Sequence, residues 1–331
     1  MSLHKFCIAP MIDYTDRHCR YFFRKLTKKA FLYSEMVVAD AIVYGDKDFF
    51  LKFNDSEHSV ALQIAGSKPK NLSYAAKCGE DYGYDEINFN LGCPSKRVQE
   101  GNFGACLMND LDLVESCLTS VIKAVNIPVT VKCRIGIDED DPYVVLPIMI
   151  ERLKTIGIKT IIIHARKAIL NGLDPKENRE IPPLDYDLVR LIKRKWPDLN
   201  LVLNGGVNSI EQAKKELNSN KHDPDGVMMG RAAYIDPFLL TNIDHIFYDE
   251  KKRDQSRFDI VKEMIPYIET EISYGVHLNH ITRHMLGLFH GVKGAKLWRS
   301  YLSENAPKRK NDINVIKEAL IKIEEVQKEV V

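Results

Sequence analysis

The stretch PVTVKCRIGIDEDDPYVVLPIMIERLKTIGIKTIIIHAR, residues 128–166, contains a strand, a helix and a second strand in succession. Residues 128–136 and 159–166 are rich in apolar residues, as is typical of strands buried on both faces of a parallel sheet. Residues 143–156 between them show apolar residues at helical spacing. The stretch therefore predicts one strand–helix–strand unit of an α/β fold.

The same alternation extends in both directions along the chain. Strand-like runs occupy residues 6–11, 30–37, 59–66, 86–92, 128–136, 159–166, 201–207 and 226–232. Helical periodicity occupies residues 16–26, 70–83, 111–125, 143–156, 185–196 and 209–217. Eight strands alternating with helices over about 240 residues predict an α/β fold of the (β/α)8 TIM-barrel class. The alternative, an open doubly wound sheet, favours a G-x-G-x-x-G turn after its first strand, where this chain has APMIDYT.

The last quarter of the chain has a different pattern. No strand-like run follows residue 250, and residues 258–272 and 313–330 are amphipathic. The charged segment 249–257 is a natural boundary. We therefore predict a catalytic barrel over residues 1–248 and a C-terminal helical domain over residues 249–331.

The composition excludes several classes of protein. Hydrophobic residues make up 45% and charged residues 28% of the chain, which is ordinary for a soluble globular protein. No apolar run approaches the roughly 18 residues of a membrane span, and the N-terminus lacks a signal-peptide layout, so we expect a cytoplasmic protein. The seven cysteines are odd in number and form no C-x-x-C pair. They predict neither a disulfide framework nor a zinc site.

One part of the chain is strongly basic although the whole carries a net charge of only +1. Residues 277–310 contain seven lysines and arginines against one acidic residue. Such a concentrated stretch favours an anionic partner that binds this part alone. The alternative is a solvated helix face with no partner.

Polar side chains recur where the predicted strands end, which is where barrel enzymes carry their active sites. Capping or loop bracing could explain any single one, but their number predicts a site. These residues are Pro10, Met11, Gln63, Asn90, Cys93, Lys132, Arg134, His164, Arg166, Asn204, Gly205, Gly206, Gly230 and Arg231.

The glycines after the seventh and eighth strands, Gly205, Gly206 and Gly230, predict a phosphate cradle of exposed backbone N–H groups, to which Arg231 could add a charge. Tight turns are the alternative. Lys132 and His164 lie on neighbouring strands, and two such cations are costly side by side unless an anionic group lies between them. An isoalloxazine ring that gains negative charge on reduction would suit them, whereas a buried, satisfied histidine is the ordinary alternative for His164.

The segments at these strand ends resemble a known family. They are LQIAG (62–66), NFNLGCPSKRV (88–98), GACLM (104–108), VKCRIG (131–136), IIIHAR (161–166), NGGV (204–207) and VMMGRAAY (227–234). Together they resemble the tRNA-dihydrouridine synthases, FMN-dependent reductases of uridine in transfer RNA. Residues 164–186, 280–306 and 312–320 resemble the A-type bacterial subfamily, so the resemblance covers nearly the whole chain.

The resemblance implies the roles of individual residues. NADPH would be the reductant, tRNA the partner through its D-loop and elbow, and uridines 20 and 20a the targets, with no metal and no obligate protein partner. Asn90 would place the target uracil, and Lys176, Arg179, Lys296 and Arg299 would contact the RNA; the family has arginine where this chain has Lys296. FMN would be bound by Pro10, Met11, Gln63, Lys132, His164, Asn204, Gly205, Gly206, Gly230 and Arg231.

The reaction needs a hydride at C6 of the uracil, from N5 of reduced FMN, and a proton at C5 from a fixed general acid. The resemblance implies that Cys93 is this acid, and a cysteine thiol, with an ordinary pKa of ~8.5, is mostly protonated at neutral pH and so could donate. Gly101 and Gly104 in the following loop suggest that it closes over the flavin. The target base must leave its stack at a cost of a few kcal/mol, which the basic stretch could offset by binding the rest of the tRNA.

A helix predicted over residues 279–291 places His280, Arg283 and His284 on one face, for RNA contact or plain exposure, and Met285, Leu288 and Phe289 in the core. Two histidines without a carboxylate or thiolate do not predict a metal site.

Two other functions would fit parts of this pattern. An FMN barrel that reduces free pyrimidines, similar to dihydroorotate dehydrogenase, would share the cradle but has no need of a basic helical domain. An RNA-binding barrel without chemistry would have no need of Cys93, Lys132 and His164.

Overall fold

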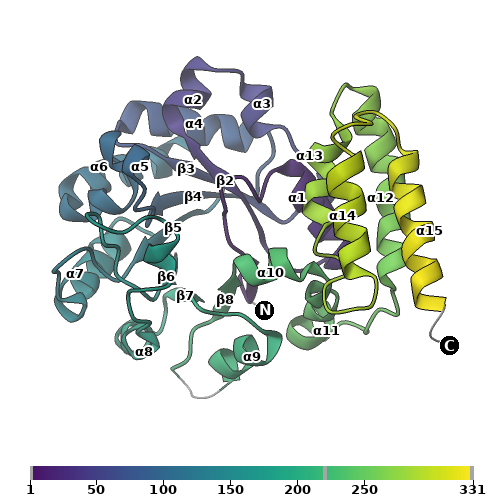
Figure 1. Cartoon of the computed structure of the whole chain (residues 1–331). Helices are drawn as coiled ribbons and strands as arrows, with labels where there is room; N and C mark the ends of the chain where they lie inside the picture. Colours follow the sequence, from purple (N-terminus) through teal and green to yellow (C-terminus); the bar gives the residue numbers. More distant parts are fainter. Residues whose placement is uncertain (1–2, 219–221, 329–331) are drawn as a thin grey trace. The chain divides into compact units, whose positions relative to one another are not determined.

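The computed structural model describes residues 3–218 and 222–328, so the outermost ends of both predicted domains, residues 1–2 and 329–331, lie outside it. Eight parallel strands form one sheet in the order β1-β8-β7-β6-β5-β4-β3-β2, and a bridge between Cys7 and Phe31 joins its two edges (Figure 1). The predicted TIM barrel is confirmed with all eight strands. They are β1 (Phe6–Ile8), β2 (Leu32–Val38), β3 (Val60–Ala65), β4 (Glu86–Leu91), β5 (Val129–Arg134), β6 (Thr160–His164), β7 (Asn200–Asn204) and β8 (Gly226–Met229).

The predicted helices between the strands are also present. Asp110, Asp141 and Asp185 each cap the helix that follows, because their carboxylates accept a backbone N–H of its first turn. The short helices α2 (Ala39–Tyr44), α3 (Lys47–Leu51) and α5 (Lys96–Glu100) were not predicted, since fewer than two turns give no readable periodicity. The longer ones are α1 (Arg17–Leu26), α4 (Pro69–Asp81), α6 (Leu111–Ala124), α7 (Pro142–Thr155), α8 (Tyr186–Lys195) and α9 (Ile210–Asn218).

The barrel interior is polar at its N-terminal end and apolar above it. The buried carboxylate of Glu86, the first residue of β4, accepts from Thr130 at 2.6 Å and from Tyr33 at 3.1 Å, and lies 2.6 Å from His4 Nε2. A buried carboxylate is tolerated only when it is hydrogen-bonded in this way. The apolar layer consists of Cys7, Ala9, Phe31, Tyr33, Ala61, Ile162, Val202 and Met228.

The chain divides by contacts into two compact units. The first, the barrel unit, contains the residues up to Ile12 and Ala30–Gly230; the second, the helical unit, contains Asp13–Lys29 and the residues from Arg231 onward. Helix α1 therefore belongs to the helical unit although it lies between β1 and β2 in sequence. The predicted domain boundary at residues 248/249 remains a prediction about folding domains.

The helical unit is held together by ion pairs between α1 and distant helices. Arg17 makes a two-pronged contact with the Glu271 carboxylate at 2.7 and 2.5 Å. The Asp16 carboxylate accepts from Arg283 at 2.7 Å and lies 3.0 Å from His284 Nε2. The unit's helices after residue 230 are α10 (Arg231–Ile235), α11 (Ile243–Tyr248), α12 (Arg257–Ser273), α13 (Leu278–Thr282), α14 (Ala295–Asn305) and α15 (Asn314–Lys328).

The helix predicted over residues 279–291 is wrong in its extent. Helix α13 ends at Thr282, a 3-10 turn covers Arg283–Met285, and Gly287 and Gly291 lie in the turns that follow. Met285, Leu288 and Phe289 are buried as predicted. His284 is also buried, so the prediction that it lies on a surface face is wrong. Its ring nitrogens face Asp16 and Tyr234, which are its partners. Across residues 3–218 and 222–328, no helix has both the length and the apolar character needed to cross a membrane.

Candidate functional site

Cys93 lies in a tightly held turn directly after β4. The side-chain oxygen of Asn90 accepts hydrogen bonds from the backbone N–H groups of Gly92 and Cys93, both at 3.0 Å. The Cys93 carbonyl accepts from Ala105 N at 2.9 Å, and its thiol lies 3.6 Å from the Ser95 hydroxyl. Cys93 is half-buried, whereas four of the other cysteines are fully buried. The turn thus fixes the backbone and leaves the thiol partly accessible.

The structure shows why position 104 is a glycine, which the sequence alone did not reveal. Its φ is +72°, and a Cβ there would lie 2.7 Å from the Cys93 carbonyl oxygen. Only glycine lets the 3-10 turn Gly104–Asn109 approach Cys93 closely enough to form the bond to its carbonyl. The predicted loop closure remains a prediction.

A chain of side-chain amides connects this turn to the floor of the barrel. Asn90 donates to Gln63 at 2.8 Å, Gln63 donates to Asn88 at 2.7 Å, and Asn88 donates to Thr130 at 2.8 Å. Asn88 was not among the predicted site residues. The signal was present in NFN, because alternate residues of a strand face the same side and Asn90 was already taken to face the site.

The strand register places the predicted residues near the carboxyl ends of neighbouring strands, with Lys132 two residues before Arg134 on β5. Asn90 pairs with Lys132 across β4 and β5, Arg134 pairs with His164 across β5 and β6, and His164 pairs with Asn204 across β6 and β7. The carboxyl ends of three adjacent strand pairs therefore present their polar side chains together, as the sequence predicted.

The pKa values of Lys132 and His164 are both strongly lowered. Burial, followed by the charge of Arg134, lowers the pKa of Lys132 from 10.5 to about 8, although part of its side chain is open to solvent. Burial, followed by Arg134 and Lys132, lowers the pKa of His164 well below its usual 6.5. Within the described parts of the chain neither side chain has a hydrogen-bond partner. At neutral pH the site therefore holds an ammonium ion and a neutral imidazole.

The glycine pair after β7 forms a cradle beside His164. Gly205 and Gly206 have φ values of +99° and +72°, and a Cβ on Gly205 would lie 2.3 Å from the His164 ring. Tyr186 braces the turn by donating to the Gly205 carbonyl at 2.5 Å. Gly230, by contrast, has ordinary space around it, with Ala9 and Met11 both 3.6 Å from a Cβ placed there.

The remaining predicted cofactor residues lie around these strand ends. Pro10 and Met11 follow β1, and Met11 packs on the apolar layer of the barrel. Asn204 donates to the Met228 carbonyl at 2.8 Å, so its amide ties β7 to β8. Arg231 is exposed and begins α10, in the helical unit.

Arg134 and Arg166, the two other polar strand ends, brace loops. Arg134 is buried and donates to the carbonyls of Gly92, Lys167 and Asn178 at 3.2, 3.0 and 2.8 Å. Arg166 donates to the carbonyls of Glu180 and Pro182. The loop-bracing alternative is therefore right for both.

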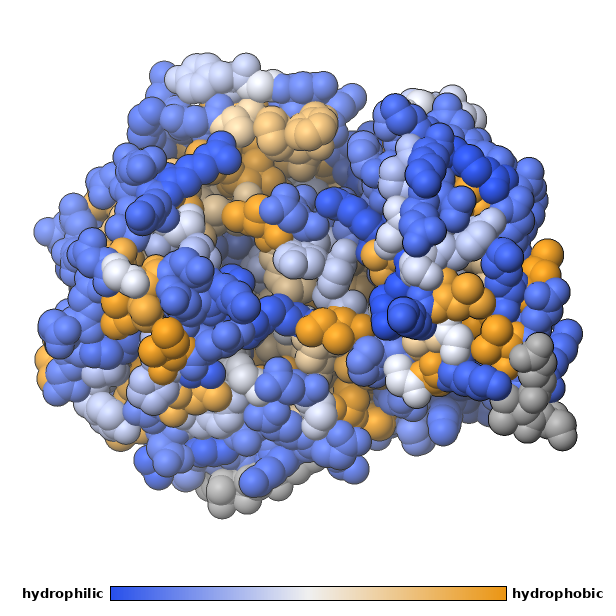
Figure 2. Space-filling view, in the orientation of Figure 1, coloured by the Kyte–Doolittle hydropathy of each residue, from blue (hydrophilic) through white to orange (hydrophobic). Residues whose placement is uncertain are grey.

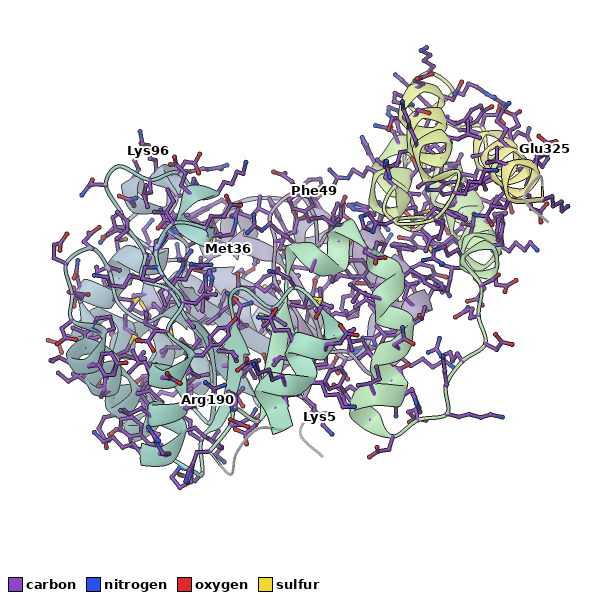
Figure 3. All side chains as sticks on the ribbon, turned by 60° about the horizontal axis from the view of Figure 1, so that its bottom comes forward. Lys5, Met36, Phe49, Lys96, Arg190 and Glu325 are labelled. Carbon is purple, nitrogen blue, oxygen red and sulfur yellow. The ribbon has the colours of Figure 1, made fainter. Side chains whose placement is uncertain are left out.

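The predicted RNA-contacting residues are all exposed. Lys176 directly precedes the 3-10 turn Glu177–Arg179 of the barrel unit and Arg179 ends it, and Lys296 and Arg299 lie three residues apart on α14 of the helical unit. Lys96 and Arg97, which follow Cys93 on α5, are also exposed, and Lys96 points outward into solvent (Figure 3).

Two of the seven cations in residues 277–310 are engaged in ion pairs: Arg283 with Asp16, and Arg309 with Asp312 and Glu318. The other five have no ion-pair partner among the described residues and are exposed. They are Lys293, Lys296, Arg299, Lys308 and Lys310. The face of the molecule in Figure 2 is mostly hydrophilic, with apolar side chains in small separate patches.

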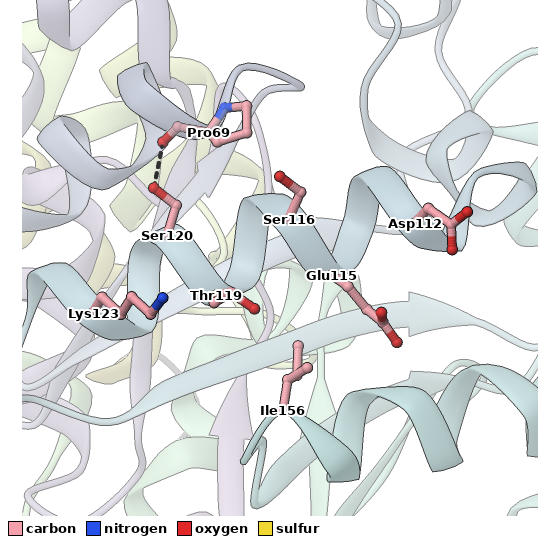
Figure 4. A pocket seen from close by; sticks show the side chains of 8 residues that line it. All are labelled: Pro69, Asp112, Glu115, Ser116, Thr119, Ser120, Lys123 and Ile156. Atoms are coloured by element: carbon pink, nitrogen blue, oxygen red, sulfur yellow. Dashed lines mark hydrogen bonds between the residues drawn. The ribbon is translucent and has the colours of Figure 1, made fainter.

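A hollow on the outer, helical layer of the barrel unit is not a second candidate site (Figure 4). Its two carboxylates, Asp112 and Glu115, accept from Arg152 at 2.5 and 2.6 Å, so they are already paired. Its lining comprises Pro69, Asp112, Glu115, Ser116, Thr119, Ser120, Lys123 and Ile156. No group of three or more His, Cys, Asp or Glu side chains within residues 3–218 and 222–328 is arranged to hold a metal ion.

Comparison with known proteins places the chain in a family. Residues 7–325 match the family described as dihydrouridine synthase (Dus). The chain is 51% identical to the tRNA-dihydrouridine(20/20a) synthase of Vibrio cholerae over 96% of its own length and 95% of that protein. It is 52% identical to the tRNA-dihydrouridine(20/20a) synthase of Escherichia coli K12, over 96% and 90% of the two chains. The enzyme of the same name from Shewanella oneidensis is 52% identical over 94% and 92%.

Proposed function

Because the chain belongs to the dihydrouridine synthase family, we propose that it uses FMN and NADPH to reduce uridines 20 and 20a in the D-loop of tRNA to 5,6-dihydrouridine. The observation that carries the proposal is the position of Cys93. A partly accessible thiol follows β4, at the end of the barrel where Lys132, His164 and the Gly205–Gly206 cradle lie on neighbouring strands.

The residues at the barrel mouth fit FMN. The Gly205–Gly206 turn has no Cβ atoms and two positive φ values, which suits close approach of a phosphate to backbone N–H groups. The His164 ring lies beside this turn, and among the described residues the side chains of His164 and Lys132 have no hydrogen-bond partner. The residues that would hold FMN are Pro10, Met11, Gln63, Lys132, His164, Asn204, Gly205, Gly206, Gly230 and Arg231. FMN held by these residues and reduced by NADPH would be the source of the hydride that C6 of the uracil receives.

Lys132 and His164 have separate electrostatic tasks in this proposal. The low pKa of His164 keeps its imidazole neutral at pH 7, so it donates one hydrogen bond without adding charge. The Lys132 ammonium, with a pKa of about 8, is the cation that stabilises negative charge on the cofactor's ring. A reduced flavin beside it would favour the charged form of Lys132 and raise this pKa again.

Cys93 completes the addition. Its S–H bond breaks as the proton passes to C5, the uracil 5,6 double bond becomes single, and the thiolate left behind regains a proton from solvent. Because the Gly92–Cys93 backbone is fixed by Asn90, the thiol needs little reorganisation to reach one face of the base.

Asn90 serves both partners of this proton transfer. Its oxygen holds the Cys93 turn, and one of its two N–H groups goes to Gln63. The second N–H is available for a uracil carbonyl, so one side chain sets the relative position of the acid and the base.

We further propose that the exposed cations bind the rest of the tRNA. Lys176 and Arg179 would contact the RNA from the barrel unit, and Lys296 and Arg299 from the helical unit. Phosphate contacts by such side chains supply most of the affinity for a nucleic acid and make it salt-dependent. A lysine at position 296 gives a point charge in place of a two-pronged contact. The helical domain, residues 249–331, would then be the tRNA-binding part of a cytoplasmic enzyme that works without an obligate protein partner.

The decisive experiment incubates the FMN-loaded protein and NADPH with tRNA that lacks dihydrouridine, and maps the product by mass spectrometry. We expect dihydrouridine at positions 20 and 20a, and no reduction of free uracil or oxidation of dihydroorotate. Turnover of a free pyrimidine without turnover of tRNA would favour the reductase of free pyrimidines. A colourless protein that binds tRNA without flavin would favour an RNA-binding barrel.

The assignment of the acid has its own test. Cys93→Ala should bind FMN with an unchanged absorption spectrum and be reduced by NADPH at the normal rate. Its reduction of tRNA should fall by about 100-fold or more, the typical contribution of a positioned general acid. A wild-type rate of tRNA reduction would rule out Cys93 as the proton donor.

A further inference from the structure

Every backbone polar group of the three residues Gly92, Cys93 and Pro94 is hydrogen-bonded. Asn90 accepts from the N–H groups of Gly92 and Cys93, and Ala105 donates to the Cys93 carbonyl. The two outer carbonyls are held by side chains: Arg134 Nε donates to Gly92 O at 3.2 Å, and Gln99 Nε2 donates to Pro94 O at 2.8 Å. Proline has no N–H, so each backbone N–H and carbonyl of this turn has a hydrogen-bond partner within the protein.

The same two side chains also hold a second segment. Arg134 Nη1 donates to the carbonyls of Lys167 and Asn178 at 3.0 and 2.8 Å, and Gln99 Nε2 donates to the Leu170 carbonyl at 2.9 Å. These carbonyls belong to residues 167–179, the segment that follows β6 and carries Lys176 and Arg179. We call Arg134 and Gln99 the clamp, because each donates hydrogen bonds both to the Cys93 turn and to the 167–179 segment.

The 167–179 segment is itself internally fixed. The fully buried amide of Asn178 donates to the carbonyls of Ile169, Leu173 and Asp174, at 2.8, 3.2 and 3.2 Å, and accepts from Ile169 N at 2.7 Å. A displacement of the segment at Lys176 or Arg179 is therefore carried to Asn178, whose own carbonyl bonds Arg134.

We infer that Arg134 and Gln99 are positioning residues that couple RNA contact by the 167–179 segment to the placement of the Cys93 thiol. The inference rests on the proposed function, in which Lys176 and Arg179 bind tRNA and Cys93 protonates the uracil. The clamp makes the acid's position depend on whether the RNA-contacting segment is seated. Neither clamp residue touches the substrate in this account.

Simple bracing of a loop would stabilise the fold without affecting one catalytic step more than another. Coupling predicts something different: loss of the clamp should slow tRNA reduction and leave the NADPH-dependent reduction of the flavin unchanged. A displacement of about 1 Å in a catalytic group can cost roughly 100-fold in rate, so a slowing of about 10-fold or more is expected in single turnovers at saturating tRNA.

The first experiment uses Gln99→Ala with Glu100→Ala as the matched control. Glu100 is the next residue on α5 and is exposed. We expect Gln99→Ala to lower the single-turnover rate of tRNA reduction about 10-fold or more while the rate of flavin reduction stays within about 2-fold, and Glu100→Ala to change neither. Arg134→Lys keeps the charge but cannot reach three carbonyls, and should act in the same direction. A wild-type single-turnover rate in Gln99→Ala would overturn the inference.

The second experiment tests the coupling with a double-mutant cycle. The paired change Lys176→Ala and Arg179→Ala should lower the single-turnover rate at saturating tRNA in the wild-type background. In Gln99→Ala the same pair should weaken tRNA binding but leave the saturating rate unchanged. Effects that multiply independently in the two backgrounds would refute coupling.

A third measurement stays informative if the proposed function is wrong, because it needs no turnover. Alkylation of the Cys93 thiol in the protein without tRNA, followed by mass spectrometry of its peptide, reports how firmly the turn is held. Gln99→Ala should be alkylated several-fold faster than Glu100→Ala, since loss of the Pro94 bond frees the turn to open. Equal rates would overturn the clamp even if the enzyme were fully active, whereas absence of dihydrouridine with a working clamp would overturn the proposed function alone.

Discussion

Gly205→Ala tests the cradle at its tightest point. The substitution places a Cβ where φ is +99°, and that atom would lie 2.3 Å from Cδ2 and 2.7 Å from Nε2 of His164. The backbone conformation alone costs about 1–2 kcal/mol for a residue with a side chain. Displacement of the imidazole adds about 1–3 kcal/mol, as in other overpacked sites. We therefore expect the free energy of unfolding to fall by about 2–5 kcal/mol in total.

Gly157→Ala separates the two contributions. Gly157 follows α7, has a φ of +97°, and has no atom within 4 Å of the added Cβ, so this variant bears the backbone cost without a clash. Urea unfolding of both apoproteins gives the difference between their free energies of unfolding, and the contact with His164 should account for most of it. In a fluorescence titration with FMN, Gly205→Ala should bind at least about 10-fold more weakly, because the imidazole hydrogen bond is lost, and Gly157→Ala should bind normally. Equal destabilisation in the two variants, with unchanged FMN affinity, would refute the close approach of the cradle to His164.

Three further predictions follow from charged groups. Lys132→Met should raise the unfolding free energy of the apoprotein at pH 7 by up to about 3 kcal/mol, because the Lys132 amine is charged in the folded and the unfolded chain below its folded pKa of about 8. The gain should fade towards about pH 10, since the folded chain loses that proton before the unfolded chain does. Urea titrations at the two pH values check it. Burial raises the pKa of Asp16, but the hydrogen bond from His284 and the nearby positive charges outweigh it and hold the pKa below its usual value. Asp16→Asn should therefore lower the free energy of unfolding by about 1.5–3 kcal/mol at pH 7 and by progressively less below about pH 4. Thermal melts across this pH range check it. Lys296→Ala and Arg299→Ala should each weaken tRNA binding and reduce its salt slope by about one, whereas Lys317→Ala, whose ammonium pairs with Glu269, should leave the slope unchanged in filter-binding assays.

The sequence was sufficient for the barrel because each strand carried its own signal. Residues 161–163 are three isoleucines, and β6 is buried along its whole length, so a continuous apolar run correctly indicated a two-sided strand. The polar strand ends were equally readable, since a side chain such as Lys132 has no reason to follow an apolar run in a structural barrel. Helix α13 was misjudged because Gly287, in the middle of the periodic segment, lies against the carbonyls of Tyr234 and Ile235. A close approach of that kind depends on residues 52 and 53 positions away and leaves no periodic signal.

The functional meaning of arginine and histidine could not be read from position alone. Arg134 and His164 are cross-strand neighbours, yet the guanidinium of Arg134 donates to three backbone carbonyls, whereas the ring of His164 has no hydrogen-bond partner among the residues that the structure describes. The same difficulty explains His284, which looked like a surface residue at helical spacing and is buried against Asp16. In each case the partner comes from a distant segment, and the sequence shows a donor without showing what it donates to.

The sequence also did not show that Asn90, which we propose places the uracil, holds the backbone of the Cys93 turn. Asn88 and Asn90 alternate with Phe89, so both face the barrel interior, where an unpaired amide would cost several kcal/mol. Their partners Gln63 and Thr130 satisfy that demand and lead down to Glu86 on the barrel floor. The Cys93 turn is therefore connected through Asn90 to the polar side chains of the barrel floor, and through Arg134 and Gln99 to the 167–179 segment. In the proposed mechanism, a proton donor held from both sides would be firmly placed towards the cofactor and would still respond to the RNA. An enzyme that acts on one base of a large folded substrate would require both properties.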